Sequence, residues 1–132
     1  MTAGIALLLL FSAVQVIILG FALSCAAMIW LWIAPGLPLA ALALACAMGL
    51  IQGASFAAVP QLNDHPATQA QANGAMAQMG NIGNTTGTPI MALALAGIGY
   101  SALPLLAGFA FAAGLAVHLW LAHRRRKLNV PL

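Results

Sequence analysis

The residues of this chain best suited to chemistry lie within one otherwise apolar stretch, residues 69–96. At about 100° per residue, six uncharged hydrogen-bonding side chains in this stretch share one arc of a helix, spread over about 140°. We call these six residues the polar arc: Asn73, Gln78, Asn81, Asn84, Thr85 and Thr88. Hydrocarbon cannot satisfy such groups, so the polar arc predicts a surface that recognises a polar ligand. The alternative is that these amides hydrogen-bond to neighbouring helices.

Glycines occupy a different part of the same helix. Gly80, Gly83 and Gly87 fall between roughly 280° and 340° on a wheel that places Asn73 at zero, and a missing Cβ there would let another helix approach closely. Gly49 and Gly53 repeat the spacing of a close helix contact in the preceding helix, although such matches are common in so glycine- and alanine-rich a chain. We predict that all five glycines pack helices together. The preceding helix also carries two polar residues, Gln52 and Ser55, which are further candidates for the surface that recognises a ligand.

The amino-acid composition indicates that these helices fold in a lipid bilayer rather than in water. The chain has 132 residues, of which 64% are hydrophobic and 4% charged, and its mean hydropathy is +1.04. These values predict an all-α integral membrane protein with one transmembrane domain over residues 1–132 and the lipid bilayer as its main partner. The net charge of +3 comes from four consecutive basic residues, 124–127, so it indicates topology rather than nucleic-acid binding.

About four transmembrane helices are expected, over residues 11–33, 39–59, 68–96 and 102–122. Residues 1–10 are interpreted as a possible remnant of a preceding helix, with a break at Phe11 and Ser12, and residues 123–132 as a basic tail. Pro60 is expected to end the second helix, a capping box at Thr68 to begin the third, and Pro89 to kink it. The positive-inside rule places the C-terminus and the loop with Asp64 on the cytoplasmic side of the cell (inner) membrane.

Other chemistry is not supported by the residues. Cys25 and Cys46 lie in separate helices without a paired spacing, so no disulfide is expected. The three histidines have no second ligand at a useful spacing, so neither a metal nor a cofactor is expected. No set of nucleophile, base and orienting residue is present, which argues against an enzyme.

Several segments of the chain resemble a known family. GLIQGASFAAVP at residues 49–60, QAQANGAMAQMGNIGN at 69–84 and the following GTP at 87–89 resemble helices ten and eleven of major facilitator superfamily transporters, in the drug:proton antiporter branch that exports drugs and sugars. The closing helix with its RRRK tail resembles helix twelve, and the similarity covers about residues 11–127. The resemblance implies that Asn73, Asn81, Asn84 and Thr85 border a central substrate cavity. It also implies an antiporter in which this chain is the C-terminal portion.

The chain departs from that family in what it lacks. A family member has twelve helices in two halves that hold the substrate between them. The first half has no counterpart here, and the only acidic residue, Asp64, lies in a loop. We therefore expect a C-terminal fragment that exports small molecules only when an N-terminal half completes it.

Two alternatives remain. One is a four-helix transporter that works as a homo-oligomer, although proteins of that kind depend on a membrane glutamate and this chain has none. The other is a membrane subunit without transport activity that acts with a larger membrane partner. Co-purification with a partner of fixed size would distinguish them.

Overall fold

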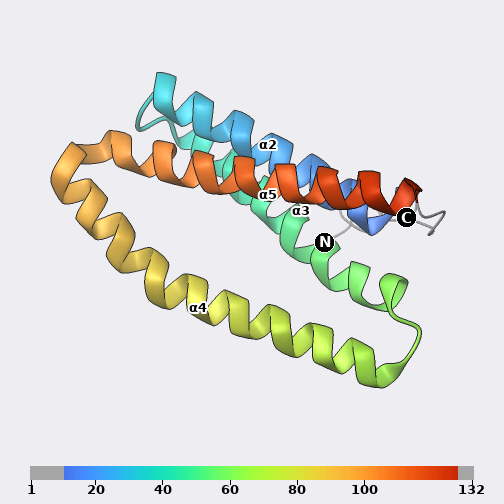
Figure 1. Ribbon diagram of the computed structural model, residues 1–132. Coiled ribbons are helices and arrows are strands. Elements are labelled where there is room, and N and C mark those ends of the chain that lie inside the picture. Colours follow the sequence, from blue (N-terminus) through green and yellow to red (C-terminus); the bar gives the residue numbers. More distant parts are fainter. Residues whose placement is uncertain (1–10, 128–132) are drawn as a thin grey trace.

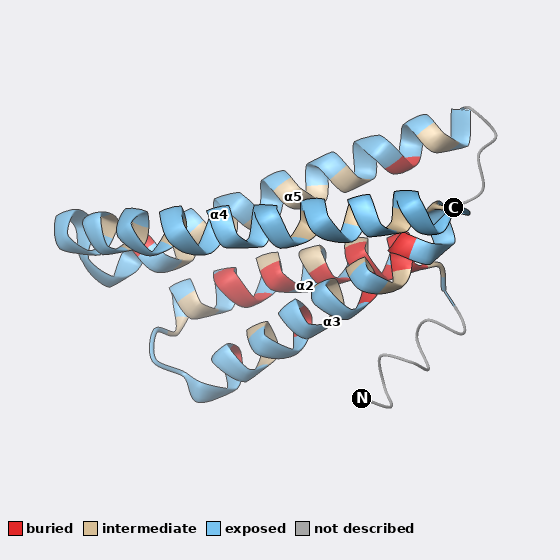
Figure 2. Cartoon of the chain, turned by 90° about the horizontal axis from the view of Figure 1, so that it is seen from below, coloured by how far each residue is buried: buried red, intermediate tan, exposed pale blue. Residues whose placement is uncertain are grey.

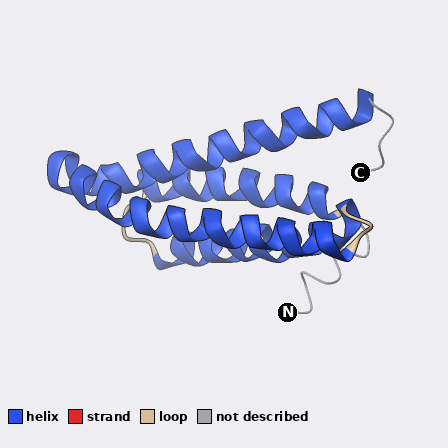
Figure 3. Ribbon diagram, turned by 60° about the horizontal axis from the view of Figure 1, so that its bottom comes forward, coloured by secondary structure: helices blue, strands red, loops and turns tan. Residues whose placement is uncertain are grey.

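The computed structural model describes residues 11–127, and within this part of the chain every regular element is a helix (Figure 3). The all-α prediction is thus confirmed for the described residues. The elements are α2 (Ala13–Ile33), α3 (Pro38–Leu62), α4 (Pro66–Ile98), the short 3-10 helix η1 (Gly99–Ser101) and α5 (Ala102–Lys127) (Figure 1). The expected remnant of a preceding helix at residues 1–10 and the end of the basic tail at 128–132 lie outside the described residues.

Within residues 11–127, three stretches of helix are long and apolar enough to cross a membrane. They are Ala13–Ile33 with 21 residues, Pro38–Leu62 with 25, and Pro66–Lys127 with 62, the last of which contains α4, η1 and α5. A helix of 20 residues spans about 30 Å, the thickness of the hydrocarbon core. These stretches indicate a protein embedded in the membrane.

Helix α2 packs between α3 and α5, and its contact with α3 is a seam of small side chains. Residues seven apart lie on the same side of each helix: Ala13, Gly20 and Ala27 on α2, and Ala40, Ala47 and Ala54 on α3, all buried. The tightest point is Gly20, where an added Cβ would lie 2.7 Å from Ile51 Cγ1 and 3.3 Å from the Ala47 carbonyl oxygen. Such close approach provides the dispersion contacts that hold helices together where water is absent.

The contact between α2 and α5 also depends on glycine. An added Cβ at Gly114 would lie 2.8 Å from Phe21 Cζ, and one at Gly108 would lie 3.5 Å from Met28 Cβ. The Phe21 ring fills the space over Gly114 and lies 5.0 Å from the His118 ring, measured between centroids. The order of packing is therefore α3, α2, α5, with bulky side chains of α2 seated on glycines of α5.

The ends of α2 and α3 support each other. The Ser12 hydroxyl accepts from the backbone N–H of Gln15, and Gln15 Oε1 accepts from the N–H of Ser12, so α2 begins with a capping box beside the break expected there. Gln61 Oε1 on α3 accepts from the backbone N–H of Ala13 at 3.1 Å. One residue of α3 thus satisfies an otherwise free donor at the start of α2.

Helix α3 does not end at Pro60, as its sequence suggested, but continues to Leu62. Proline at position 60 removes only the backbone hydrogen bond to the Phe56 carbonyl, and one lost bond near the end of the helix does not stop it. Asn63 follows the helix and its Nδ2 donates to the Val59 carbonyl oxygen at 2.9 Å. This side-chain bond satisfies one of the last carbonyls of the helix, which have no partner within it.

Helix α4 begins two residues earlier than expected. Its N-cap is His65 and its first residue is Pro66, a residue suited to the first turn because its missing N–H has no partner there. The expected capping box at Thr68 is not formed, and the Thr68 hydroxyl instead donates to the His65 carbonyl oxygen at 2.8 Å. The helix continues through Pro89 to Ile98, and the chain then reverses at Gly99, whose φ of 71° suits glycine.

Candidate functional site

The polar arc lies on a helix that the rest of the chain hardly covers. Helix α4 contains no buried residue, whereas buried residues line α2 and α3 (Figure 2). All six members of the polar arc are exposed. Among them, Thr88 alone forms a side-chain hydrogen bond to another described residue, from its hydroxyl to the Asn84 carbonyl oxygen at 3.2 Å. The amide side chains of the polar arc have no partner on α2, α3 or α5.

The direction of the polar arc follows from the residues of α4 that are half-buried. These face the other helices and are Gln69, Ala72, Met76, Gly87, Met91 and Ala94. On the same helical wheel they are centred at about 310°, and the polar arc is centred at about 70°, so the two faces are rotated by about 120°. The polar arc therefore points away from the bundle that this chain forms by itself.

The glycines predicted to pack helices do not do so within the described residues. An added Cβ at Gly80, Gly83 or Gly87 would meet no atom within 4 Å, and the same holds for Gly49 and Gly53 on α3. Close helix contacts occur instead at three other glycines, Gly20, Gly108 and Gly114. A helix from outside this chain could still approach the five predicted glycines, so their role remains a prediction.

The two polar candidates on α3 do not join the polar arc. Gln52 is exposed on α3. Ser55 is half-buried and its hydroxyl donates to the Ile51 carbonyl oxygen at 2.7 Å, which satisfies it within its own helix. Ser55 shares a hollow with Ala72 and Met76 of α4, and neither of those residues belongs to the polar arc.

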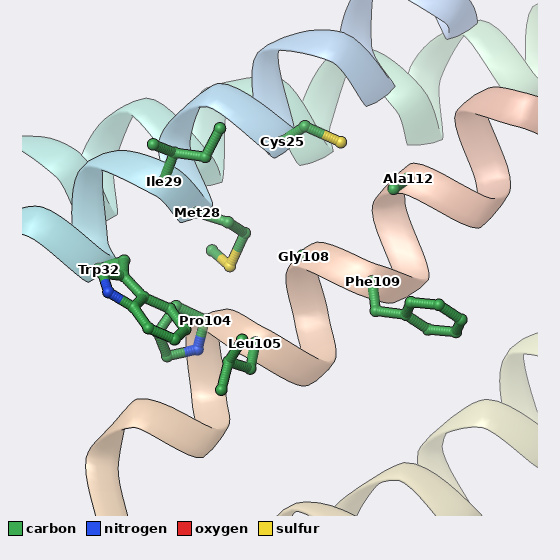
Figure 4. A pocket seen from close by; sticks show the side chains of 9 residues that line it. All are labelled: Cys25, Met28, Ile29, Trp32, Pro104, Leu105, Gly108, Phe109 and Ala112. Atoms are coloured by element: carbon green, nitrogen blue, oxygen red, sulfur yellow. The ribbon is translucent and has the colours of Figure 1, made fainter.

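Two larger hollows lie toward the turns at Pro35 and Tyr100, and both are apolar. One, of about 510 Å³, lies between α2 and α5, where Met28 points toward Gly108 and Trp32 lies beside Pro104 (Figure 4). The other, of about 780 Å³, also takes Met91 of α4 and Tyr100 into its wall. Neither hollow is lined by a charged residue or by a member of the polar arc, so neither completes the predicted cavity.

A third hollow, of about 330 Å³, lies at the opposite end of the bundle and was not expected from the sequence. Residues at i, i+3, i+4 and i+7 of two helices line it: Ser55, Ala58, Val59 and Leu62 on α3, and His118, Leu121, Ala122 and Arg125 on α5. This spacing is visible in the sequence and marks one face of each helix. It does not reveal that the two helices line the same hollow.

The two cysteines lie on α2 and α3, and His118 lies on α5. Cys25 is half-buried, Cys46 is exposed, and both are free thiols. Nδ1 of His118 lies 2.8 Å from the Gly114 carbonyl oxygen, and because a carbonyl only accepts, this nitrogen carries the proton. The described residues contain no group of three His, Cys, Asp or Glu side chains placed to hold a metal ion.

Comparison of the chain with family models, with curated proteins and with solved structures found no match. The function is therefore inferred from the residues and from their arrangement in the structure.

Proposed function

We propose that this chain forms part of the wall of a substrate cavity in a membrane efflux transporter, with four membrane-spanning helices that resemble the last four of the major facilitator superfamily. The observation that supports this proposal is the exposed polar arc, rotated by about 120° from the contacts of its own bundle. The remaining helices of the transporter come from outside this chain and face the polar arc across the cavity. The substrates are drug- or sugar-like small molecules.

The energetics of the bilayer favour a cavity over lipid on this face. An amide moved from water into hydrocarbon without a hydrogen-bond partner costs several kcal/mol, on the order of 4–8 kcal/mol in alkane. Four amide side chains of the polar arc, Asn73, Gln78, Asn81 and Asn84, would together face lipid at that cost. A water-filled path satisfies all of them, and it offers a passing substrate both hydrogen-bond donors and acceptors.

The charges of the chain limit its part in the transport cycle. Asp64 is the only acidic residue, and it lies in the loop between α3 and α4. None of α2, α3, α4 and α5 therefore carries a carboxylate that could take up and release a proton at membrane depth. In the proposed transporter the proton-coupling residue lies on helices outside this chain.

A second candidate is a membrane subunit without transport activity. The same exposed polar arc would then bind a helix of a larger partner through side-chain hydrogen bonds. A partner of fixed size that remains bound to the purified protein, and an export rate that is insensitive to changes in the polar arc, would favour this candidate.

The proposed topology can be tested by cysteine labelling. With Cys25 and Cys46 replaced by alanine, we expect an impermeant maleimide to label Ser101→Cys in intact cells and to leave Ala67→Cys unlabelled. Ala67 is the second residue of α4, Ser101 is the last residue of η1, which follows α4, and both are exposed. Ser101 is a better position than Gly99, whose positive φ would strain a cysteine. Labelling of Ala67→Cys alone would overturn a cytoplasmic C-terminus.

The cavity role can be tested with two neighbouring threonines. Thr85 belongs to the polar arc. Thr86 is rotated by about 100° from Thr85 around the helix axis, and its hydroxyl already donates to the Ile82 carbonyl oxygen. In cells whose own copy of the gene is deleted and replaced by a variant, we expect Thr85→Val to lower the rate of dye export by about threefold to tenfold, as for the loss of one substrate hydrogen bond.

The matched control is Thr86→Val, which makes the same change of atoms on the same turn. It should leave export within about twofold of the unaltered protein, because its hydroxyl faces its own backbone. Equal effects of the two variants, at equal amounts of protein in the membrane, would show that the polar arc does not face the substrate.

A further inference from the structure

We infer that the hollow at the basic end of the bundle is a binding site for one anionic phospholipid, which places part of an acyl chain in the hollow and its phosphate beside Arg125. This inference requires only that the chain is embedded in a membrane, and it stands whether or not the chain takes part in transport.

The hollow has the character of an acyl-chain site. All four long helices contribute to its wall, and most of the wall is aliphatic, including Ile17 of α2, Val59 of α3, Met76 of α4 and Leu121 of α5. Its volume of about 330 Å³ is at the lower end of small-molecule pockets. The hollow therefore holds a segment of one acyl chain of the lipid, and the lipid headgroup must remain outside the hollow.

The basic residue at the edge of the hollow favours a lipid with an anionic headgroup. Arg125 is the only one of the four consecutive basic residues that lines the hollow, and it is half-buried, whereas Arg124, Arg126 and Lys127 are exposed. The Arg124 guanidinium instead lies 5.0 Å from the centre of the Trp120 ring. The described residues that line the hollow include no carboxylate, and the Arg125 guanidinium is the charged group in this part of the wall. Arginine matches a phosphate group because its planar donors bind two oxygens together.

Further polar groups lie on the same wall. His118 lines the hollow, and its ring is held by the bond from Nδ1 to the Gly114 carbonyl and by the neighbouring Phe21 ring. Asn63, at the C-cap of α3, also lines it. A basic pocket between helices, at the level of the headgroups, is the arrangement that binds anionic lipids. The apolar hollow of about 780 Å³ at the other end is larger but has no charged residue in its wall, so volume alone does not select the site.

The test is a lipid titration of the purified full chain in a non-ionic detergent, with bound lipid counted by native mass spectrometry. We expect one phosphatidylglycerol to bind, and phosphatidylcholine with the same acyl chains to bind at least about tenfold more weakly because its net charge is zero. Glycerol phosphate, which has the headgroup chemistry without chains, should not bind measurably. Binding of glycerol phosphate as tight as that of phosphatidylglycerol would show a simple anion site and overturn the inference.

Two arginines of the same helix end provide the matched variants. Arg125→Gln and Arg126→Gln change the net charge equally, but only Arg125 lines the hollow. We expect Arg125→Gln to weaken phosphatidylglycerol binding by at least about tenfold and Arg126→Gln to change it by no more than about twofold. Equal weakening by both variants would show a diffuse attraction to the basic cluster and would overturn the inference.

The acyl-chain part of the site is tested separately. Ala72 lines the hollow from α4, so Ala72→Leu should fill part of it, whereas Ala75 is exposed on the next turn and does not line it. We expect Ala72→Leu to weaken phosphatidylglycerol binding severalfold and Ala75→Leu to leave it unchanged, with thermal stability measured for both. Unchanged binding in Ala72→Leu would show that no chain enters the hollow.

Discussion

Replacing Gly20 by leucine is expected to destabilise the bundle by at least about 1–3 kcal/mol, the usual cost of overpacking, and to lower the folded yield in detergent strongly. A Cβ at Gly20 would lie 2.7 Å from Ile51 Cγ1, 3.2 Å from the Ile51 backbone nitrogen and 3.3 Å from the Ala47 carbonyl oxygen. The Ile51 side chain could rotate away, but two of the three neighbours are backbone atoms. Helix α3 would therefore have to move away from α2 along its whole contact. Thermal unfolding followed by size-exclusion chromatography would measure the effect.

Glycines without close neighbours provide the controls. Gly53→Leu on α3 adds the same side chain where no atom lies within 4 Å, and it should leave the unfolding temperature nearly unchanged. Equal losses at Gly20 and Gly53 would contradict the packing of α2 on α3 described above. Gly83→Leu on α4 is informative in a different way, because no atom lies within 4 Å of an added Cβ there and a loss of stability would show a close helix contact that the described residues do not form.

Much of the helical layout could be predicted from the sequence, because proline, glycine and capping residues act locally. Ser12 begins α2 and the turn with Pro35 separates α2 from α3, as their local chemistry suggests. A short window cannot show a partner distant in sequence, and Gln61 caps α2 from 48 residues away. The predicted end of α3 at Pro60 was wrong because a proline in the last turn of a helix does not have to end it.

Helical spacing alone does not identify the glycines at which the helices of this chain pack closely. A glycine permits close approach, but whether a helix approaches depends on which face of its own helix is turned inward. Gly49 and Gly53 have the familiar spacing and remain exposed, whereas Gly20 is buried within a seven-residue repeat with Ala13 and Ala27. That repeat, matched by Ala40, Ala47 and Ala54 on the next helix, was the stronger signal.

The polar arc shows what periodicity can and cannot predict. Helical spacing alone places six polar side chains on one face, since that depends only on 3.6 residues per turn. It does not tell whether the face turns inward or outward. In the structure the half-buried side of α4 carries Ala72, Met76 and Met91, and the polar arc lies elsewhere on the helix. The predicted cavity therefore has one wall in this chain and needs another.

The second prediction concerns transport by the purified chain in reconstituted vesicles. Purified chain inserted into liposomes should show no flux of dyes or sugars under an imposed proton gradient, because alternating access needs two units that rock about a site held between them. The polar arc has no facing helix among the described residues, and the described helices carry no carboxylate that could couple a proton.

Vesicles without protein provide the baseline, and an ionophore that collapses the gradient separates coupled flux from leakage. Flux that depends on the gradient and is lost in Asn81→Leu, with Ile82→Leu as the matched neighbour outside the polar arc, would show that this chain transports without any other protein. In that outcome the polar arc would have to be completed by a second copy of this chain, because no other helix is present in the vesicle. The proposal of a wall that requires foreign helices would then be wrong, while the role of the polar arc in binding substrate would stand.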